Sequence, residues 1–457
     1  MDTNHKMNAL ERRAVLSLGA LYAFRMLGLF MVLPLLATYA ADLPGSTPLM
    51  VGLALGAYGL TQALLQVPFG LLSDRIGRKP VIVMGLLLFA AGSVLAATAE
   101  QTTGIIAGRA LQGAGAIAST VMALLADLTR DSQRTKAMAV VGMSIGLSFC
   151  IALVLGPVVA SWFGLSGVFT LTAMLAGIGL AIVTFAVPTA EVSWAAHAET
   201  TTVPGLLGRS LADGQLQRLY CGVFALHFIL MASFLNLPVI FESSLALPRE
   251  DHAWMYLSTL LLSLAIMVPM MIFAERLRRV RLMFVAAVCM IGAAQATLAL
   301  GHWTIVSCFV TLLIFFGGFN YLEATLPSLV SKTVYAGGRG TSLGVYSTAQ
   351  FMGAFAGGAM GGWIVQTSGQ QALFSVCAGM ALIWAVYAAS MKEPRNLGNL
   401  VFSFPGSAEE FQRRADSLAL LVGVEELLIV AADQVAYLKI DEASFDHENF
   451  ALLCTQD

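Results

Sequence analysis

Four ionisable side chains lie inside long apolar runs of the sequence, where they could bind a solute or carry protons. They are Arg25, Arg109, His227 and Glu323. A charge at the centre of a bilayer costs roughly 2.5 to 3.5 kcal/mol even on permissive insertion scales, so a charged residue kept there indicates a function. Glu323, in FNYLEATLP, is the one carboxylate deep inside such a run. Because burial favours the neutral form of a carboxyl group, we expect Glu323 to exchange protons, with His227 as the second candidate.

Each of these residues also has a simpler interpretation, which the sequence leaves open. Arg25 either lines a cavity and binds an anionic or polar solute, or pairs with Glu323 as a counter-ion. Arg109 either takes part in the coupling, with Gln112 one turn further on the same face, or extends its side chain to the lipid headgroups. A close arginine would hold Glu323 ionised, and a lone histidine such as His227 is often a neutral, hydrogen-bonded packing residue.

Neutral polar side chains in the apolar runs could add hydrogen-bonding points to a cavity. They are Asn320, Gln62, Gln66, Gln350, Tyr58 and Tyr346. Any of them could instead bond to a neighbouring helix. The sequence does not identify the solute, because it does not show which faces of the apolar runs point inward.

A second group of charges lies in the stretch GLLSDRIGRKP, residues 70–80, directly after an apolar run. The carboxylate of Asp74 could accept hydrogen bonds from the free amides at the start of the next helix. Arg78 could reach a second carboxylate, and Asp127 is our candidate. Gly70 has no side chain and would let another helix approach closely. The matching surface would be the glycine-rich face formed by Gly353, Gly357, Gly358, Gly361 and Gly362.

We expect this stretch to act as a conformational latch that holds two parts of the molecule together in one state only. The predicted latch consists of Gly70, Asp74, Arg75, Gly77, Arg78, Lys79 and Asp127. An exposed ion pair is worth about 0 to 1 kcal/mol, which suits a switch between two states of similar free energy. The simpler interpretation is that the bases only orient the chain in the membrane. A weaker second copy, AERLRR, contains Glu275, Arg276 and Arg279, and has Arg278 where the first copy has Gly77.

The composition indicates which elements carry these residues. The chain has 457 residues, 58% of them hydrophobic and 11% charged, whereas a soluble domain carries about 25% charged residues. A helix needs roughly 20 mostly apolar residues to cross the hydrocarbon layer, so we predict an all-α membrane protein. The sequence contains twelve such runs, near residues 14–41, 49–72, 80–98, 104–126, 136–162, 167–187, 218–241, 252–274, 282–300, 303–330, 341–366 and 372–391.

The basic residues orient these runs. Of the 25 lysines and arginines, nineteen fall on one face of a twelve-span arrangement, here called the inner face, and only Arg249 falls on the outer face. Short loops rich in lysine and arginine stay in the cytoplasm. We therefore predict twelve crossings, with both termini on the inner, cytoplasmic face.

The two parts of the chain repeat each other at an offset of 201 to 205 residues. Leu33-Pro34 then matches Leu237-Pro238, and the charged segment SDRIGR matches AERLRR. Transporters of several folds are built from such repeated halves. We predict an N-terminal six-helix half at 1–187, a cytoplasmic linker at 188–217, a C-terminal six-helix half at 218–395 and a small domain at 396–457.

Three motifs resemble those of the major facilitator superfamily of secondary transporters. GLLSDRIGRK is similar to the loop motif between spans 2 and 3, and RALQGAGA, residues 109–116, is similar to the span-4 motif with a buried arginine. Gly156 and Pro157 look like the antiporter motif of the drug:proton branch, although Ala152 and Ala160 stand where glycines are more usual. The resemblance implies the major facilitator fold, alternating access between the two halves, and a role of Arg109 in proton coupling.

The tail after residue 395 has the pattern of a small α+β domain. We expect strands near 399–404, 425–431 and 434–440, a helix from Ser407 to about Val422 and a last helix at 445–454. This order resembles a ferredoxin-like module related to heavy-metal-associated domains, and the tail makes the chain look like the YajR-type transporters. The metal-binding CxxC is replaced by PGSAEE, so we expect no metal site. Binding of another ion or small molecule, docking on the linker, and stabilisation of the fold all remain open.

These patterns predict a proton-coupled secondary transporter, most simply an exporter or antiporter of a small solute, in the bacterial cytoplasmic membrane. The chain contains no GxxxxGK[ST] sequence, so ATP is not expected as the energy source, and we expect no cofactor and no nucleic-acid partner. The six cysteines occur singly, which argues against disulfides. We expect a monomer and no enzymatic activity. Import, or a membrane sensor that signals through its tail, are the alternatives.

Overall fold

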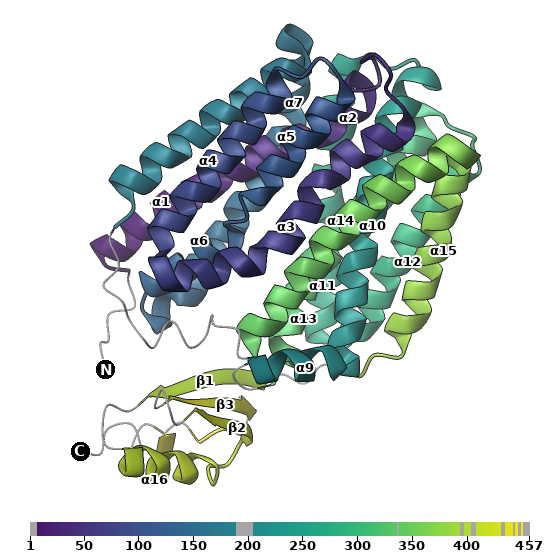
Figure 1. Cartoon of the computed structure of the whole chain (residues 1–457). Helices are drawn as coiled ribbons and strands as arrows, with labels where there is room; N and C mark the ends of the chain where they lie inside the picture. Colours follow the sequence, from purple (N-terminus) through teal and green to yellow (C-terminus); the bar gives the residue numbers. More distant parts are fainter. Residues whose placement is uncertain are drawn as a thin grey trace.

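Long helices make up most of the molecule, and a small domain of three strands and a helix follows them (Figure 1). The structure is a computed structural model that describes residues 7–188, 204–335, 338–393, 397–403, 408–430, 435–441, 444–446 and 449–450. The predicted last helix at 445–454 lies mostly outside these residues.

The N-terminal half consists of helices that pair along their length, α1 with α7, α3 with α5, and α4 with both α5 and α7. Its elements are α1 (Ala9–Met31), α2 (Leu33–Tyr39), α3 (Pro48–Ile76), α4 (Arg78–Ala97), α5 (Thr102–Ala114), α6 (Ala118–Asp127), α7 (Asp131–Ala181) and the π-helical turn η1 (Ile182–Ala186). Two breaks interrupt the predicted spans. Pro34 begins α2 because it has no N–H to continue α1, and Gly115, which packs against Gly85, separates α5 from α6.

The C-terminal half repeats this arrangement, with α10 against α14, α12 against α15, and α13 against both α11 and α12. Its elements are α9 (Pro204–Ala212), α10 (Gly214–Ser243), the 3-10 turn η2 (Arg249–Asp251), α11 (His252–Arg276), α12 (Val280–Ala299), α13 (Ile305–Thr333), α14 (Arg339–Ser368) and α15 (Gln370–Ala389). The short helix α9 belongs to the predicted linker.

Ten helical segments in the described part of the chain are long and apolar enough to cross a membrane. One of them, Lys136–Ala186, contains Gly164, whose φ of 63° and ψ of −167° interrupt the helix where the sequence predicted two separate spans. Helix α14 is not among the ten, although it has 30 residues. Its many glycines lower its hydropathy, since they carry no apolar side chain.

The two halves meet mainly along α3 and α14, which run side by side (Figure 1). The closest approaches lie at the outer part of both helices. A Cβ on Gly52 would strike the backbone of Gly358, and one on Gly56 would lie 2.8 Å from the carbonyl oxygen of Phe355. Only residues without a side chain permit such contact between backbones. Further contacts between the halves join α2 to α10 and α7 to α11.

The C-terminal domain forms a three-stranded antiparallel sheet in the order β1-β3-β2. Its elements are β1 (Leu397–Ser403), α16 (Ala408–Leu418), β2 (Val424–Val430) and β3 (Val435–Asp441). Strand β3 lies between β1 and β2, which α16 connects in sequence. The predicted helix to Val422 is too long, because turns begin after Leu418 and lead to Gly423, whose φ of 86° ends any helix.

Candidate functional site

Arg78 is the centre of a buried charge cluster at the inner end of the N-terminal half. Gly77, with a φ of 96°, separates α3 from α4 and makes Arg78 the first residue of α4. Its guanidinium forms an ion pair with Asp74 and lies 3.3 Å from Asp127 Oδ2, and it donates a 2.6 Å hydrogen bond to Ser73 Oγ. The Arg78 side chain is 8% exposed and that of Asp127 5%. The structure therefore brings together the three charges that the sequence suggested.

The cluster differs from the predicted latch in two respects. Asp74 does not cap α4, because the Asp74 carboxylate contacts Arg78 instead. The N-terminus of α4 has no side-chain hydrogen bond. The three charged residues also contact one another within the N-terminal half, on α3, α4 and α6, whereas the latch was expected to reach the C-terminal half. In this conformer the cluster therefore holds three helices of the N-terminal half together rather than the two halves.

Gly70 was expected to face the glycines of α14, and this prediction is wrong for this conformer. The nearest atom to a Cβ built on Gly70 is Ser119 Oγ, 3.8 Å away on α6 of the same half. Gly353 and Gly357 face α10, and Gly361 lies closest to the same helix. Of the predicted surface only Gly358 and Gly362 contact α3, at its outer part, where Gly52 allows the backbones to meet.

The remaining latch residues have separate surroundings. Lys79 donates a 2.6 Å hydrogen bond to the carbonyl oxygen of Val187, just after η1, and Arg75 is exposed. In the second copy, Arg278 adopts a φ of 51° at the position that corresponds to Gly77. The other residues of that copy, Glu275, Arg276 and Arg279, are exposed and form no ion pair within the described ranges.

Arg25 lies in the core of the N-terminal half and contacts neutral groups. Its Nη2 donates to Tyr58 Oη at 2.9 Å, Gln62 Oε1 at 3.0 Å and the Gly115 carbonyl oxygen at 3.1 Å. That carbonyl lies at the break between α5 and α6 and also accepts from the Ile117 amide at 2.9 Å. Phe89 covers the guanidinium, with its ring centre 5.7 Å away. The alternative in which Arg25 pairs with Glu323 is wrong for this conformer, because Arg25 is buried among residues of its own half.

Arg109 is also buried, with 1% of the residue exposed. It donates to the Ala54 carbonyl oxygen at 3.3 Å and to Gln112 Oε1 at 3.0 Å, and Gln112 in turn donates to Ser93 Oγ at 2.8 Å. The ring of Tyr58 lies 5.0 Å from the guanidinium. The side chain points inward, so the alternative in which Arg109 extends to the lipid headgroups is wrong. Tyr58 contacts both buried arginines.

Glu323, His227 and Gln350 meet in the C-terminal half, on α13, α10 and α14. His227 Nδ1 lies 3.1 Å from the Val223 carbonyl oxygen, so this nitrogen carries the proton. Nε2 of the neutral ring can then accept from Gln350 Nε2 at 2.8 Å. The same amide donates to Glu323 Oε1 at 3.4 Å. Glu323 Oε2 is buried without a hydrogen-bond partner, 3.7 Å from His227 Nε2.

This arrangement can hold one additional proton. A proton between Glu323 Oε2 and His227 Nε2 would join them directly and remove the acceptor that Gln350 uses. The Glu323 side chain is 40% exposed. Asn320, one turn before Glu323, donates to Ser263 Oγ on α11 at 2.8 Å. It joins two helices of the C-terminal half and does not contact the Glu323 carboxylate.

The antiporter-like motif lies where α7 crosses the break between α1 and α2. A Cβ on Gly156 would lie 2.8 Å from the Met31 carbonyl oxygen, so this position requires glycine. Pro157 lies within α7. Ala152 is completely buried, which shows that a methyl group fits where the resembling motif more usually has glycine.

A buried ion pair near the inner face, between Glu11 and Arg130, was not among the predicted site residues. Glu11 lies in the first turn of α1 and forms a capping box with the N-cap residue Asn8. Its carboxylate lies 2.9 Å from Arg130 Nε, and the residue is 2% exposed. The capping pattern NALE was available as a signal, because an acid at this position often has a local backbone role. No local signal indicated the distant partner Arg130, because 119 residues separate it from Glu11.

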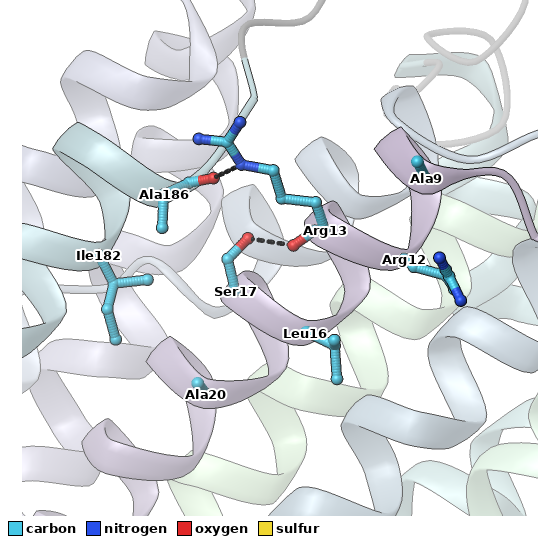
Figure 2. Close-up of a pocket in the computed structure, with 8 residues that line it drawn as sticks. All are labelled: Ala9, Arg12, Arg13, Leu16, Ser17, Ala20, Ile182 and Ala186. Carbon is cyan, nitrogen blue, oxygen red and sulfur yellow. Dashed lines mark hydrogen bonds between the residues drawn. The ribbon is translucent and has the colours of Figure 1, made fainter.

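A surface cavity of about 570 Å³ lies away from these clusters (Figure 2). It is a groove between α1 and η1, at the inner end of the N-terminal half. Arg13 crosses one side of it and donates to the Ala186 carbonyl oxygen at 2.8 Å. None of the predicted coupling residues lines this groove.

The C-terminal domain contacts the inner end of the C-terminal half. Lys439 of β3 donates to the carbonyl oxygens of Thr333 and Val334 at 3.1 Å and 2.7 Å, where α13 ends. Burial lowers the pKa of Lys439. Arg209 of α9 lies 3.9 Å from Glu426 of β2. The domain therefore contacts both the linker and a membrane helix.

Comparisons with known proteins agree with this architecture. The chain matches the model of the Major Facilitator Superfamily over residues 18–358 and 219–405. It is 44% identical over 438 residues to the inner membrane transport protein YajR of Escherichia coli (strain K12), a match that covers 96% of each chain. It is 28% identical over 345 residues to the multidrug resistance protein MdtH of Aeromonas hydrophila, which covers 74% of this chain and 83% of that one.

A solved structure supports the fold alone. A bacterial homolog of the human lysosomal transporter Spinster, in an inward-facing and occupied conformation, superposes with a TM-score of 0.67 at 11% identity. The superposition covers 84% of this chain and 97% of that one. The chain belongs to the Major Facilitator Superfamily and is a secondary transporter rather than an enzyme.

Proposed function

We propose that this protein is a proton-coupled exporter of a small solute in the bacterial inner membrane. The cluster of Glu323, His227 and Gln350 carries the proposal, since it places a partly exposed carboxylate beside a neutral imidazole. The similarity to an inner membrane transport protein supports the location, and the weaker similarity to a multidrug resistance protein supports export. Import by the same cycle remains the alternative.

Twelve crossings fit the proposal best. Helix α7 would supply two spans on either side of Gly164, and α14 would cross the membrane despite its low hydropathy, because it packs between α3 and α10. Both termini then lie on the inner face with most of the basic residues. The split β1-α16-β2 arrangement around β3 supports a ferredoxin-like assignment for the C-terminal domain.

Protonation would act on the contact between the halves through α14. A proton shared by Glu323 and His227 joins α13 directly to α10 and releases Gln350, which lies on α14. The next residue, Phe351, has its ring 6.3 Å from that of Tyr58 on α3 of the other half. Because α14 carries the principal contact with the N-terminal half, its release would favour the conformer with the outer end open.

The buried arginines of the N-terminal half complete this scheme. Arg25 and Arg109 both contact Tyr58, through its hydroxyl and its ring respectively. Any shift of Tyr58 against Phe351 would change the surroundings of both guanidinium groups. In this proposal Gln62 and the buried arginines form the polar surface to which a solute binds after the halves separate.

The Arg78 cluster would serve as a latch only in the opposite conformer. Here its charges are paired within one half, as expected when the inner ends are apart. We propose that it contacts the inner part of α14 when the outer end opens. The free energy of such a contact must stay small, because both conformers have to be populated during each cycle.

The first experiment measures how pH changes the conformation, and needs no known solute. The six native cysteines are replaced, and spin labels are placed at Thr98 and Thr367, which are exposed at the outer ends of α4 and α14. Acidification from pH 8 to pH 5 should increase the fraction of molecules that show the longer distance between the two labels. Glu323→Gln should remove this response, whereas Glu100→Gln, in an exposed outer loop, should retain it.

The second measurement tests transport in proteoliposomes. An imposed pH gradient is followed with an internal fluorescent pH indicator, while lipophilic cations, organic anions and neutral drugs are added one at a time. A solute that dissipates the gradient in the native protein, and not in Glu323→Gln, identifies proton-coupled transport. A pH response that persists unchanged in Glu323→Gln would contradict the assignment of this residue.

A further inference from the structure

Arg249 is the one basic residue predicted in the outer loops, and the structure places it between the two halves. Its Nη1 lies 3.0 Å from Oδ2 of Asp42, which follows α2 in the N-terminal half. Its Nε and Nη2 donate to the two carboxylate oxygens of Glu242, at 2.6 Å and 3.1 Å, near the end of α10. The ring of Tyr39, on α2, lies 4.6 Å from the guanidinium.

The contacts of Arg249 divide into a fixed part and a part that can separate. The two-point bond with Glu242 lies wholly within the C-terminal half and fixes the orientation of the planar guanidinium. The third nitrogen is thereby directed at Asp42. The contacts with Asp42 and Tyr39 cross to the other half, so they must break whenever the outer ends move apart.

Close backbone contact occurs at the same end of the molecule. Six residues after Asp42, α3 begins with Pro48, whose carbonyl oxygen a Cβ on Gly362 would strike. The Leu49 amide donates to Gln366 Oε1 of α14 at 3.3 Å. The outer ends of α3 and α14 are thus held together by close backbone packing. Arg249 adds an attraction between opposite charges at the same end of the molecule.

We propose that Arg249, held by Glu242, is an outer clamp that stabilises the outer-closed conformer by binding Asp42 and Tyr39. The clamp is a positioning device of the transport cycle and binds no solute. It rests on the alternating-access part of the proposed function but not on proton coupling. The Arg249 side chain is 32% exposed and that of Asp42 63%, so water can replace the contact when the clamp opens.

The test uses the labels at Thr98 and Thr367 in the cysteine-replaced full chain, at constant pH. We expect Arg249→Gln to raise the ratio of outer-open to outer-closed molecules by about threefold to tenfold, the effect of losing one exposed ion pair and a cation–π contact, and Asp42→Asn, which loses the ion pair alone, to raise it less. Glu250→Gln is the matched control, because it removes an exposed negative charge beside Arg249 that has no ion pair in the described chain. This control should leave the ratio unchanged.

The double variant Asp42→Asn with Arg249→Gln separates the clamp from a general charge effect. If the two residues act through their contact, the double variant opens the outer end no further than Arg249→Gln alone. Equal distances in all variants would overturn the proposal. An effect of Arg249→Gln without any effect of Asp42→Asn would also overturn it, because the change would then arise within the C-terminal half. Failure of the proton-coupling test with Glu323→Gln would leave these results intact.

Discussion

The charge clusters at the two ends of the molecule contain the same kinds of side chain in opposite arrangements. At the inner end, Arg78 is buried and its acidic partners all belong to the N-terminal half. At the outer end, Arg249 is partly exposed and has acidic partners in both halves. The comparison indicates that burial makes a cluster a permanent part of one half, whereas exposure lets an ion pair form and break between moving parts.

The largest expected effect is the loss of the buried cluster. Arg78→Gln would leave the carboxylates of Asp74 and Asp127 close together without a base, and breaking a buried pair costs about 3 to 5 kcal/mol. We expect a large fall in the thermal stability of the purified protein. Arg75→Gln, which changes an exposed base in the same stretch, should have almost no effect. Equal stability of the two variants would show that the Arg78 cluster is not structural.

A smaller effect is expected from a methyl group at the contact between the halves. Gly52→Ala places a Cβ against the Gly358 backbone, and overpacking of this kind costs about 1 to 3 kcal/mol. Because the strain exists only while the outer end is closed, the Thr98–Thr367 distance should increase while overall stability changes little. Gly142→Ala on α7 is the control, since no atom lies within 4 Å of its Cβ position. An unchanged distance in Gly52→Ala would contradict outer closure by glycine packing.

The smallest expected effect is that of salt on the two clusters. The Debye length falls from about 30 Å at 0.01 M to about 3 Å at 1 M ionic strength, and exposed pairs are screened far more than buried ones. Raising the salt concentration should therefore open the outer end slightly in the native protein and not in Arg249→Gln. The stability difference between Arg78→Gln and the native protein should stay nearly constant. A reversed pattern would show that the assignment of buried and exposed clusters is wrong.

Local pattern predicted some of these features correctly. The pairing of Arg78 with Asp127, both in the predicted N-terminal half, was anticipated, but the expected contact of this cluster with the C-terminal half was not found in this conformer. The strands of the C-terminal domain were predicted to within a few residues, because alternation is a local signal. The helix there was overestimated, because Leu420, Leu421 and Val422 are apolar enough to continue a helix although turns follow Leu418.

Contacts between distant segments were harder to predict. Glu323 was predicted to be a proton site from its position in an apolar run, but its neighbour Gln350 appeared only among several neutral polar residues. The alternative in which Arg25 pairs with Glu323 was wrong, since the side-chain hydrogen bonds of Arg25 all go from Nη2 to Tyr58, Gln62 and Gly115 of its own half. A helical face is specified by the local period of the sequence, but the helix against which it packs is not.

Hydrophobicity and charge placement in the chain were enough to indicate a membrane protein with two related halves, and to predict its orientation and the ionisable residues to test for a function. These properties depend on the free energy of transferring each segment into lipid, which is set locally. Which end of the molecule is closed, and which charges lie across the boundary between the halves, was decided only by tertiary packing. Those contacts join residues such as Asp42 and Arg249, 207 positions apart, and their free energies depend on how the helices dock.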